Sequence, residues 1–265
     1  MAGLPSLTVI TPTLNSAGTL AETIASVAAQ DYEGGVEHIV IDGGSTDGTL
    51  DVVRAHGLRH ISEPDEGLSD ALNKGLAMAG SEVVAELNAD DLYLPGALRA
   101  VGEAFVANPG AEWVTGRCPI IGADGQPIRR GVTAYKNAML RRWSYGLHLT
   151  HNFVSAPATF VRTAALREVG GFDLRFRYSM DYDVWLKLGR RGPPVILDRD
   201  LAAFRMAGDS LSLTGFETQF VEHAQNAREH GEGHPVAVAV NGVTSRAIVL
   251  AYRQMASRAS RRDRR

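Results

Sequence analysis

Residues 83–95 read VVAELNADDLYLP, and this stretch predicts the fold more directly than any other part of the chain. It passes from a short apolar run into three polar side chains, Asn88, Asp90 and Asp91. An apolar run that opens onto acidic residues is typical of a buried strand with a ligand site at its carboxyl end. Adjacent carboxylates repel one another and call for a cation, although Asp91 could instead cap a helix that begins near Pro95. Both interpretations are open from this stretch alone.

Two strand–helix units precede this strand. Residues 7–10 (LTVI) are followed by a polar turn and by helical spacing of apolar residues over 18–29, and residues 37–42 (EHIVID) are followed by GGSTDGT and a helix over 49–56. Successive units of this kind predict a parallel sheet with right-handed crossovers. Ligands of such sheets bind outside the carboxyl ends of the strands. The loops that would open on one crevice there are 11–15, 42–45 and 88–91.

The second half of the chain is less regular. A mixed aromatic and basic stretch over 133–148 fits neither the helical nor the strand period and predicts a loop with helical pieces. Residues 178–188 (YSMDYDVWLKL) predict a helix with Asp181 in its first turn, where an ionised carboxylate is also a common cap. We expect one catalytic domain over 1–214 and a C-terminal helical extension over 215–265.

Composition excludes several classes of protein. The chain has 265 residues and a formal net charge of -3, which argues against a nucleic-acid-coating protein, although its last nine residues, SRASRRDRR, carry five arginines. The single cysteine, Cys118, excludes an internal disulfide, and no run of 18 apolar residues occurs. We therefore expect a cytoplasmic protein with no nucleic-acid partner, in peripheral contact with the inner face of the plasma membrane at most, through the basic C-terminus.

Five ordered segments resemble the family 2 glycosyltransferases, which are inverting enzymes with the GT-A nucleotide-sugar fold. The segments are VITPTLNSAGTLAETIASV, HIVIDGGSTDGT, DEGLSDALNKGLAMAGSEVVAELNADD, ATFVRTAALREVGGFD and MDYDVWLKL, within about residues 7–190. Each is weak alone, but their order makes the resemblance specific. It implies an α/β fold with a Rossmann-like, mostly parallel central sheet flanked by helices.

The resemblance also implies roles for individual residues. The nucleotide-sugar side would comprise Pro12, Thr13, Asn15, Asp42, Gly67, Asp70, Asn88 and Asp90. The acidic D-x-D element of the family falls on Asn88, Ala89 and Asp90, so an amide replaces its first acid. Asp90 and Asp91 would hold Mg²⁺ or Mn²⁺ together with the donor diphosphate, since hard cations accept few protein ligands when phosphate oxygens complete the shell. Asp181 would be the general base, with His151 and Trp185 on the acceptor side.

These roles imply transfer of a sugar, of the hexosyl type, from a nucleoside-diphosphate sugar to a hydroxyl. A UDP-sugar is favoured, because Asp42 could accept a hydrogen bond from the uracil imide. The acceptor would be a saccharide or a lipid-linked molecule in cell-surface polysaccharide or glycolipid synthesis. The cation would stabilise charge on the leaving diphosphate, while the base removes the proton of the attacking hydroxyl.

The sequence gives less support to three other functions. A catalytically silent, nucleotide-binding scaffold with the GT-A fold has Asn88 as its only support. A nucleotidyltransferase would need a Gly-rich, basic loop after the first strand to hold a triphosphate, but TPTLNSAGT contains no Lys or Arg. A dinucleotide-binding oxidoreductase would show G-x-G-x-x-G, which is absent after both early strands.

Overall fold

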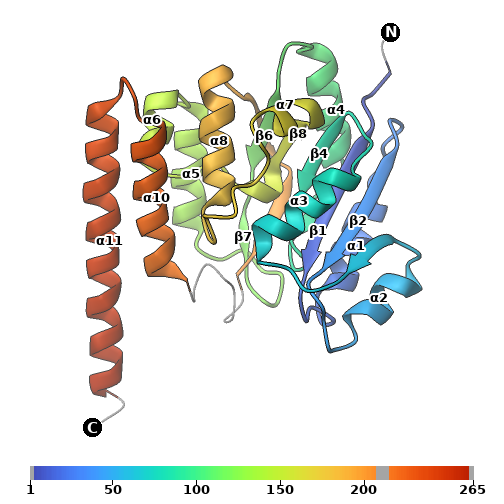
Figure 1. Ribbon diagram of the computed structural model, residues 1–265, viewed down its shortest axis with the longest axis horizontal. Coiled ribbons are helices and arrows are strands. Elements are labelled where there is room, and N and C mark those ends of the chain that lie inside the picture. The colour runs from blue at the N-terminus through green and yellow to red at the C-terminus, as the bar shows by residue number, and fades with distance from the viewer. Residues whose placement is uncertain (1–2, 207–214, 263–265) are drawn as a thin grey trace.

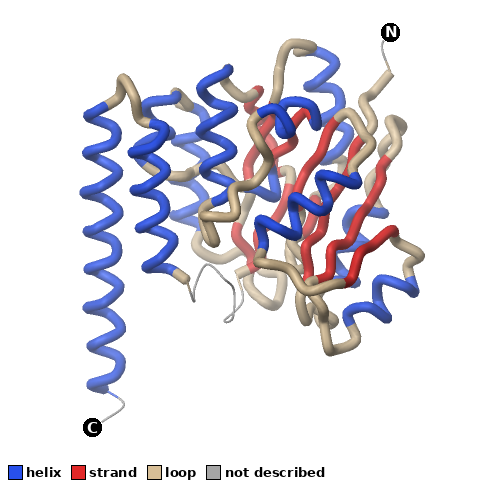
Figure 2. The backbone as a smooth tube through the Cα atoms, in the orientation of Figure 1, coloured by secondary structure: helices blue, strands red, loops and turns tan. Residues whose placement is uncertain are grey.

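A seven-stranded sheet forms the centre of the molecule (Figure 1, Figure 2). The computed structural model describes residues 3–206 and 215–262. In spatial order the strands are β3 (Arg59–Ser62), β2 (Val36–Asp42), β1 (Leu7–Thr13), β4 (Val83–Glu86), β8 (Thr159–Arg162), β6 (Trp113–Arg117) and β9 (Val195–Asp200). Neighbouring strands run parallel except at β8, which is antiparallel to both β4 and β6. The predicted mostly parallel α/β fold is confirmed.

The register of the parallel strands brings three predicted loops to the same edge. Thr13 at the end of β1 lies opposite Asp42 at the end of β2, and Ile10 lies opposite Glu86 at the end of β4. All seven residues of β1 are buried, as expected for a central strand covered on both faces. The loops after β1, β2 and β4 therefore leave the sheet side by side.

Helices cover both faces of the sheet. They are α1 (Leu20–Ala28), α2 (Thr49–Ala55), α3 (Leu68–Met78), α4 (Ala97–Ala107), α7 (Thr163–Glu168) and α8 (Met180–Arg191). Ile10 of β1 packs in one core with Leu72 of α3 and Val184 of α8. Val9, its neighbour on the opposite face of β1, packs in another core with Val101 of α4. The sheet thus has one core on each face.

A small second sheet holds the segment after β4. Its strands are β5 (Leu92–Tyr93), β10 (Ala202–Arg205) and β7 (Ile120–Ile121), with β10 in the middle. The 3-10 helix η1 (Ala156–Ala158) leads directly into β8 of the large sheet. The edge strand β3 was not predicted.

Residues 133–148 contain the expected helical pieces, but helix makes up most of this stretch, and only residues 142–144 lie between the two helices. These helices are α5 (Arg130–Arg141) and α6 (Tyr145–Thr150). Only Leu140 is buried in α5, so no broad apolar stripe marks this helix in the sequence.

Two C-terminal helices, α10 (Phe216–His230) and α11 (Pro235–Arg262), confirm the predicted helical extension as elements. α10 packs on α8 and α6, and α11 forms the outer edge of the molecule in Figure 1. The predicted domain boundary at 214 and the last three residues of the basic tail lie outside the described residues. None of the helices in the described part of the chain is both long and apolar enough to cross a membrane.

Candidate functional site

The loops after β1 and β2 are tied to each other by hydrogen bonds. Asn15 has a φ of 51°, in the left-handed region that Asn tolerates. Its N–H donates to Ser45 Oγ at 2.8 Å, and its Oδ1 accepts from the Thr46 N–H at 2.9 Å. Pro12 and Thr13 are buried at the end of β1, and Thr13 Oγ1 has no hydrogen-bond partner among the described residues. The two loops therefore form one connected wall at this edge of the sheet.

Asp42 is buried beneath this wall. Its Oδ2 accepts from the N–H groups of Gly44 at 3.2 Å and Ser45 at 3.1 Å, and from the Ser62 hydroxyl at 2.7 Å. The Ser45 hydroxyl donates to Oδ1. The carboxylate thus organises the turn after β2. Its contact with a uracil ring stays a prediction, and it would require the hydroxyl of Ser45 or Ser62 to turn away.

Gly67 and Asp70 shape the start of α3. Gly67 is the N-cap at φ 115°, where only glycine is unstrained. Asp70 Oδ2 accepts from the Glu66 N–H at 3.1 Å and pairs with Lys74 Nζ at 3.1 Å, and these partners lower the pKa of Asp70. An ionised carboxylate in a first turn is stabilised by the helix dipole. Their contact with a donor stays a prediction.

The adjacent residues Asp90 and Asp91 have different environments. Asp91 is 0% exposed, and its Oδ1 accepts from the Arg205 N–H at 2.8 Å while its Oδ2 accepts from Asn88 Nδ2 at 3.2 Å. Asp90 is half-buried, and Arg205 Nε donates to its carbonyl oxygen at 2.9 Å. The Asp90 carboxylate is therefore the more accessible of the two.

Asp91 does not cap a helix, so that interpretation is wrong. The helix that follows is α4, which begins at Ala97 with Gly96 as its N-cap and with no side-chain cap. Asp91 instead joins the β4 loop to β10, because its carboxylate pairs with the backbone of Arg205. The Arg205 guanidinium extends this link to Glu22 of α1, with Nη2 and Oε2 at 2.6 Å.

Burial raises the pKa of Asp90 and raises the pKa of Asp91 well above its usual range. The charge of Asp90 raises the pKa of Asp91 further, while the charge of Arg205 lowers both values. Two neighbouring carboxyl groups that resist ionisation favour a bound cation, which would neutralise them.

The residues at this edge suit a divalent cation that arrives with phosphate oxygens. The described residues contain no group of three or more His, Cys, Asp or Glu side chains that could hold a metal by themselves. A single accessible carboxylate beside an amide is a sparse oxygen site, which Mg²⁺ and Mn²⁺ accept when phosphate and water supply the remaining ligands. Asp90 is the side chain that the geometry favours as a direct ligand.

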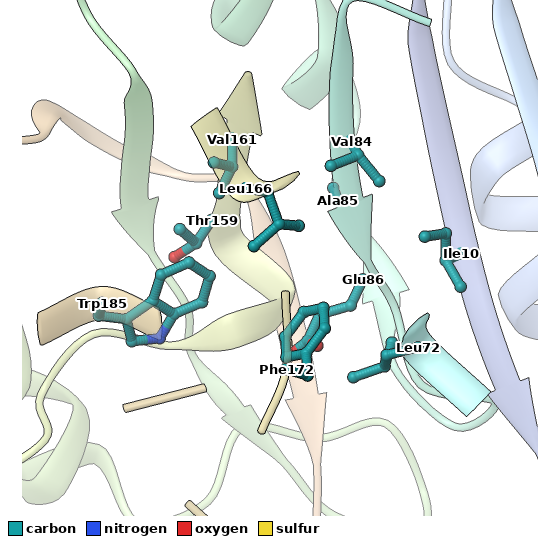
Figure 3. A pocket seen from close by; sticks show the side chains of 10 residues that line it. All are labelled: Ile10, Leu72, Val84, Ala85, Glu86, Thr159, Val161, Leu166, Phe172 and Trp185. Atoms are coloured by element: carbon teal, nitrogen blue, oxygen red, sulfur yellow. The ribbon is translucent and has the colours of Figure 1, made fainter. Parts of the chain in front are cut away.

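Glu86, which the sequence reasoning did not single out, is a buried carboxyl group whose pKa responds to the charges of both Asp91 and Asp181. In Figure 3 its side chain lies among apolar residues that line a small cavity, including Ile10, Leu72 and Phe172. Burial raises the pKa of Glu86 to about 8, and the charges of Asp181 and Asp91 contribute to this shift. Glu86 is therefore close to both acids, which places the end of β4 and the start of α8 at the same site.

Asp181 is the second residue of α8 and is held from two sides. Its Oδ1 accepts from the Tyr182 N–H at 2.7 Å, and its Oδ2 accepts from Asn152 Nδ2 at 3.1 Å. Ser179, not Asp181, occupies the N-cap position. Burial raises the pKa of Asp181, and the charge of Lys136 opposes the shift. A carboxylate with a raised pKa is a stronger base, as proton abstraction from a hydroxyl requires.

The predicted acceptor-side residues differ in accessibility. His151 is half-buried next to Asn152, and its Nε2 lies 2.9 Å from the Tyr135 hydroxyl. Trp185 is 2% exposed and stacks on Trp113, with 5.9 Å between ring centroids. The structure thus places His151 beside Asn152 and Trp185 in the core, where its ring is almost completely covered.

Four further residues of the site were missed by sequence reasoning: Glu86, Lys136, Asn152 and Arg205. Lys136 Nζ donates to Ser155 Oγ at 2.8 Å, and burial lowers the pKa of Lys136. Only Glu86 carried a signal, as an acidic residue inside an apolar strand. The arrangement as a whole offers one accessible carboxylate for a cation and a second, fixed carboxylate for a proton.

Comparison with known proteins gives consistent matches. A family model described as "Glycosyl transferase family 2" matches residues 8–169, more than half of the chain. An uncharacterized glycosyltransferase of Mycobacterium tuberculosis is 31% identical over 214 residues, which is 78% of each chain. A PGL/p-HBAD biosynthesis glycosyltransferase of Mycobacterium bovis is 30% identical over 190 residues, which is 68% of each.

Solved structures share the fold at low sequence identity. A mannosyltransferase from Pyrobaculum calidifontis, in complex with GDP-Man and Mn²⁺, superposes with a TM-score of 0.65 at 22% identity, covering 97% of this chain and 80% of that one. Residues 1–349 of S. aureus TarS, in complex with UDP-GlcNAc, give 0.61 at 18% identity, covering 83% and 66%. The chain spans 39% of the longer S. aureus TarS chain.

Proposed function

Because the chain belongs to glycosyl transferase family 2 and is a glycosyltransferase, we propose that it transfers a sugar, with inversion, from a nucleoside-diphosphate sugar to a hydroxyl acceptor. One observation carries this proposal. The charges of Asp181 and of Asp91, the neighbour of Asp90, both act on the buried Glu86 carboxyl group, which supports a shared site for the Asp90 loop and Asp181. Asp90 and Asp181 nevertheless have different partners. An inverting displacement needs two such groups, one for the leaving group and one for the nucleophile.

We propose that the donor lies across the carboxyl ends of β1, β2 and β4. Its nucleotide would contact the wall formed by Pro12, Thr13, Asn15 and Asp42, and its diphosphate would lie near Gly67, Asp70, Asn88 and Asp90. Similar structures hold UDP-GlcNAc and GDP-Man, which supports a nucleotide sugar as the class of donor. UDP remains the favoured nucleotide because of Asp42.

A divalent cation, Mg²⁺ or Mn²⁺, would be held by Asp90 and would neutralise the charge that develops on the departing diphosphate. The similar mannosyltransferase structure contains Mn²⁺. Asp91 would support this site indirectly, because both of its carboxylate oxygens already accept hydrogen bonds from Arg205 and Asn88.

Asp181 would remove the proton from the acceptor hydroxyl. Asn152 orients one of its oxygens, and the neighbouring His151 would lie toward the acceptor. The acceptor we propose is a saccharide or a lipid-linked molecule of the cell surface, which agrees with the role in PGL/p-HBAD biosynthesis named for one similar protein. The silent-scaffold alternative has no further observation in its favour.

We also propose peripheral contact with an anionic membrane through α11, at the inner face of the plasma membrane. The outward side of this helix carries exposed apolar residues at helical spacing, namely Val236, Val240, Val243 and Leu250. The chain ends in an arginine-rich segment, which an anionic lipid surface attracts. Such contact would bring the site close to a lipid-linked acceptor.

The donor class is tested by titrating the protein with UDP, dTDP and GDP in the presence of Mn²⁺, by calorimetry and thermal shift. We expect UDP to bind most tightly and to raise the melting temperature. If none of the three nucleotides binds, the proposed donor class is wrong.

A further inference from the structure

α10 contacts the segment immediately before Asp181 with two buried side chains. The Glu222 carboxylate accepts from the N–H groups of Arg177 at 3.0 Å and Tyr178 at 2.8 Å, and from the Ser179 hydroxyl at 3.2 Å. Asn226 Nδ2 donates to the carbonyl oxygen of Ser179 at 3.2 Å and to its Oγ at 2.9 Å. Five hydrogen bonds thus hold three residues of the chain from a helix that lies 43 residues or more further along it.

These contacts fix the segment that leads into α8, which has no side-chain cap of its own. Ser179 occupies the N-cap position but makes no side-chain cap hydrogen bond to α8. Its hydroxyl instead donates to Glu222 of α10. Because no side chain caps the first turn of α8, the direction of this turn depends on contacts from other elements. Asp181 lies two residues after Ser179, so its carboxylate follows any shift of this segment.

α11 holds the other side of Asp181. Asn241 Nδ2 donates to the carbonyl oxygen of Leu149 at 2.9 Å and lies 3.4 Å from the Tyr182 hydroxyl. That hydroxyl donates to the carbonyl oxygen of His148 at 2.8 Å. The loop that begins here supplies Asn152, the hydrogen-bond donor to Asp181. The C-terminal helices therefore contact the chain close to both donors that hold the Asp181 carboxylate, Tyr182 and Asn152.

We propose that Glu222 is a positioning residue for Asp181, so that the C-terminal extension completes the catalytic site. This inference rests on the proposed role of Asp181 as the base. Glu222→Gln keeps the size of the side chain but replaces one acceptor oxygen with an NH₂ group, which faces N–H and O–H donors. At least one of the three contacts to residues 177–179 is then lost, and the start of α8 loosens.

The test is a double-mutant cycle. The parental protein, Glu222→Gln, Asp181→Asn and the double variant are compared by kcat and KM for nucleotide release from UDP-N-acetylglucosamine and from GDP-mannose, with water as acceptor, well below the melting temperature. We expect Glu222→Gln to lower kcat roughly 10-fold or more at unchanged donor KM. In the Asp181→Asn background the same change should cost no further activity, because the group that it positions is gone.

Glu229→Gln is the matched control, since Glu229 is on the same helix but pairs with the exposed Arg175. It should leave kcat unchanged. Unchanged kcat in Glu222→Gln, or an equal loss in both backgrounds, overturns the positioning role. Parental turnover in Asp181→Asn instead overturns the base assignment itself. Should Glu222→Gln fail to fold, Asn226→Ala is carried through the same cycle, with a smaller loss expected and the same criterion.

Discussion

At the scale of single residues, the fold gives different environments to side chains that are neighbours in the sequence. Asp91 is fully buried against the backbone of Arg205, whereas the carboxylate of Asp90 is accessible. Asp183, two residues after Asp181, pairs with Lys187 and His230 at 2.7 Å each. In each pair, Asp90 with Asp91 and Asp181 with Asp183, one carboxylate is structural and the other is available for chemistry.

This separation predicts opposite results for two substitutions. Asp90→Asn should abolish most of the Mn²⁺ dependence of nucleotide binding, with little change in stability. Asp91→Asn should keep the metal dependence but lower the free energy of unfolding by roughly 1–3 kcal/mol, because the new NH₂ group leaves a buried donor without an acceptor. Calorimetric titration of UDP and GDP, with and without Mn²⁺, and urea unfolding measure the two effects. Nucleotide binding that is unchanged by EDTA would contradict the metal assignment.

Glu86 makes stability depend on pH. Its pKa is about 8 in the folded protein and 4.5 ordinarily, so between these values the folded state holds a proton that the unfolded state has lost. Its contribution to stability is present below pH 4.5 and is lost as pH rises through 8. Glu86→Gln cannot titrate, so we expect it to become more stable than the parental protein by on the order of a few kcal/mol as pH rises from 5 to 9. The exposed Glu82→Gln is the control, and parallel stability curves for Glu86→Gln and the parent would refute the shift.

At the scale of elements, α3 packs closely on β1, the strand whose end leads into the proposed donor site. A Cβ atom on Gly75 of α3 would lie 2.4 Å from Ile10 Cγ2, and Ile10 sits in a strand covered on both faces. Gly75→Ala should therefore destabilise the protein by about 1–3 kcal/mol, although alanine is the better helix former. Gly80→Ala, where no atom lies within 4 Å, is the control. Urea unfolding measures both, and a more stable Gly75→Ala would contradict this packing.

The elements that the sequence predicted well have one clear period. β1, β2 and β4 each contain a short run of apolar residues, and α1 repeats its apolar residues at helical spacing, so their observed bounds lie close to the predicted ones. α5 buries only Leu140 and shows no such pattern. The antiparallel position of β8 between β4 and β6 depends on long-range pairing that the segment TFVR does not encode.

At the scale of the whole molecule, distant parts of the chain build the site. Asp90 and Asp181 were predicted because they lie inside matching segments. Arg205 is 114 residues from Asp91, and Glu222 is 43 residues from Ser179, so no local pattern connects them to the acids that they support. Such residues are found only once the fold has brought them together.

The outer face of α11 predicts binding to membranes. We expect the protein to sediment with vesicles that contain phosphatidylglycerol but not with pure phosphatidylcholine, and to be released by salt. Val243→Asp should weaken binding, because Val243 is 67% exposed on the face that would enter the lipid interface. Val132→Asp, on exposed α5, should not. No binding to anionic vesicles, or a stable dimer through α11, would overturn the membrane contact.

Asp181 is the residue on which the proposed reaction depends most. Since burial raises its pKa above the ordinary 3.8, activity should fall as the pH is lowered through that raised value, where the carboxylate takes up a proton. Asp183→Asn is the matched control on the same helix. It should lower stability through Lys187 and His230 but keep the turnover of each folded molecule.

The most direct test is the turnover of Asp181→Asn under conditions in which the variant is folded and binds nucleotide with Mn²⁺ as the parental protein does. A base at this position predicts kcat lowered by something like 10²–10⁴-fold, with unchanged nucleotide affinity. Turnover near the parental rate would contradict the account, and would move the base to His151 or Asp183.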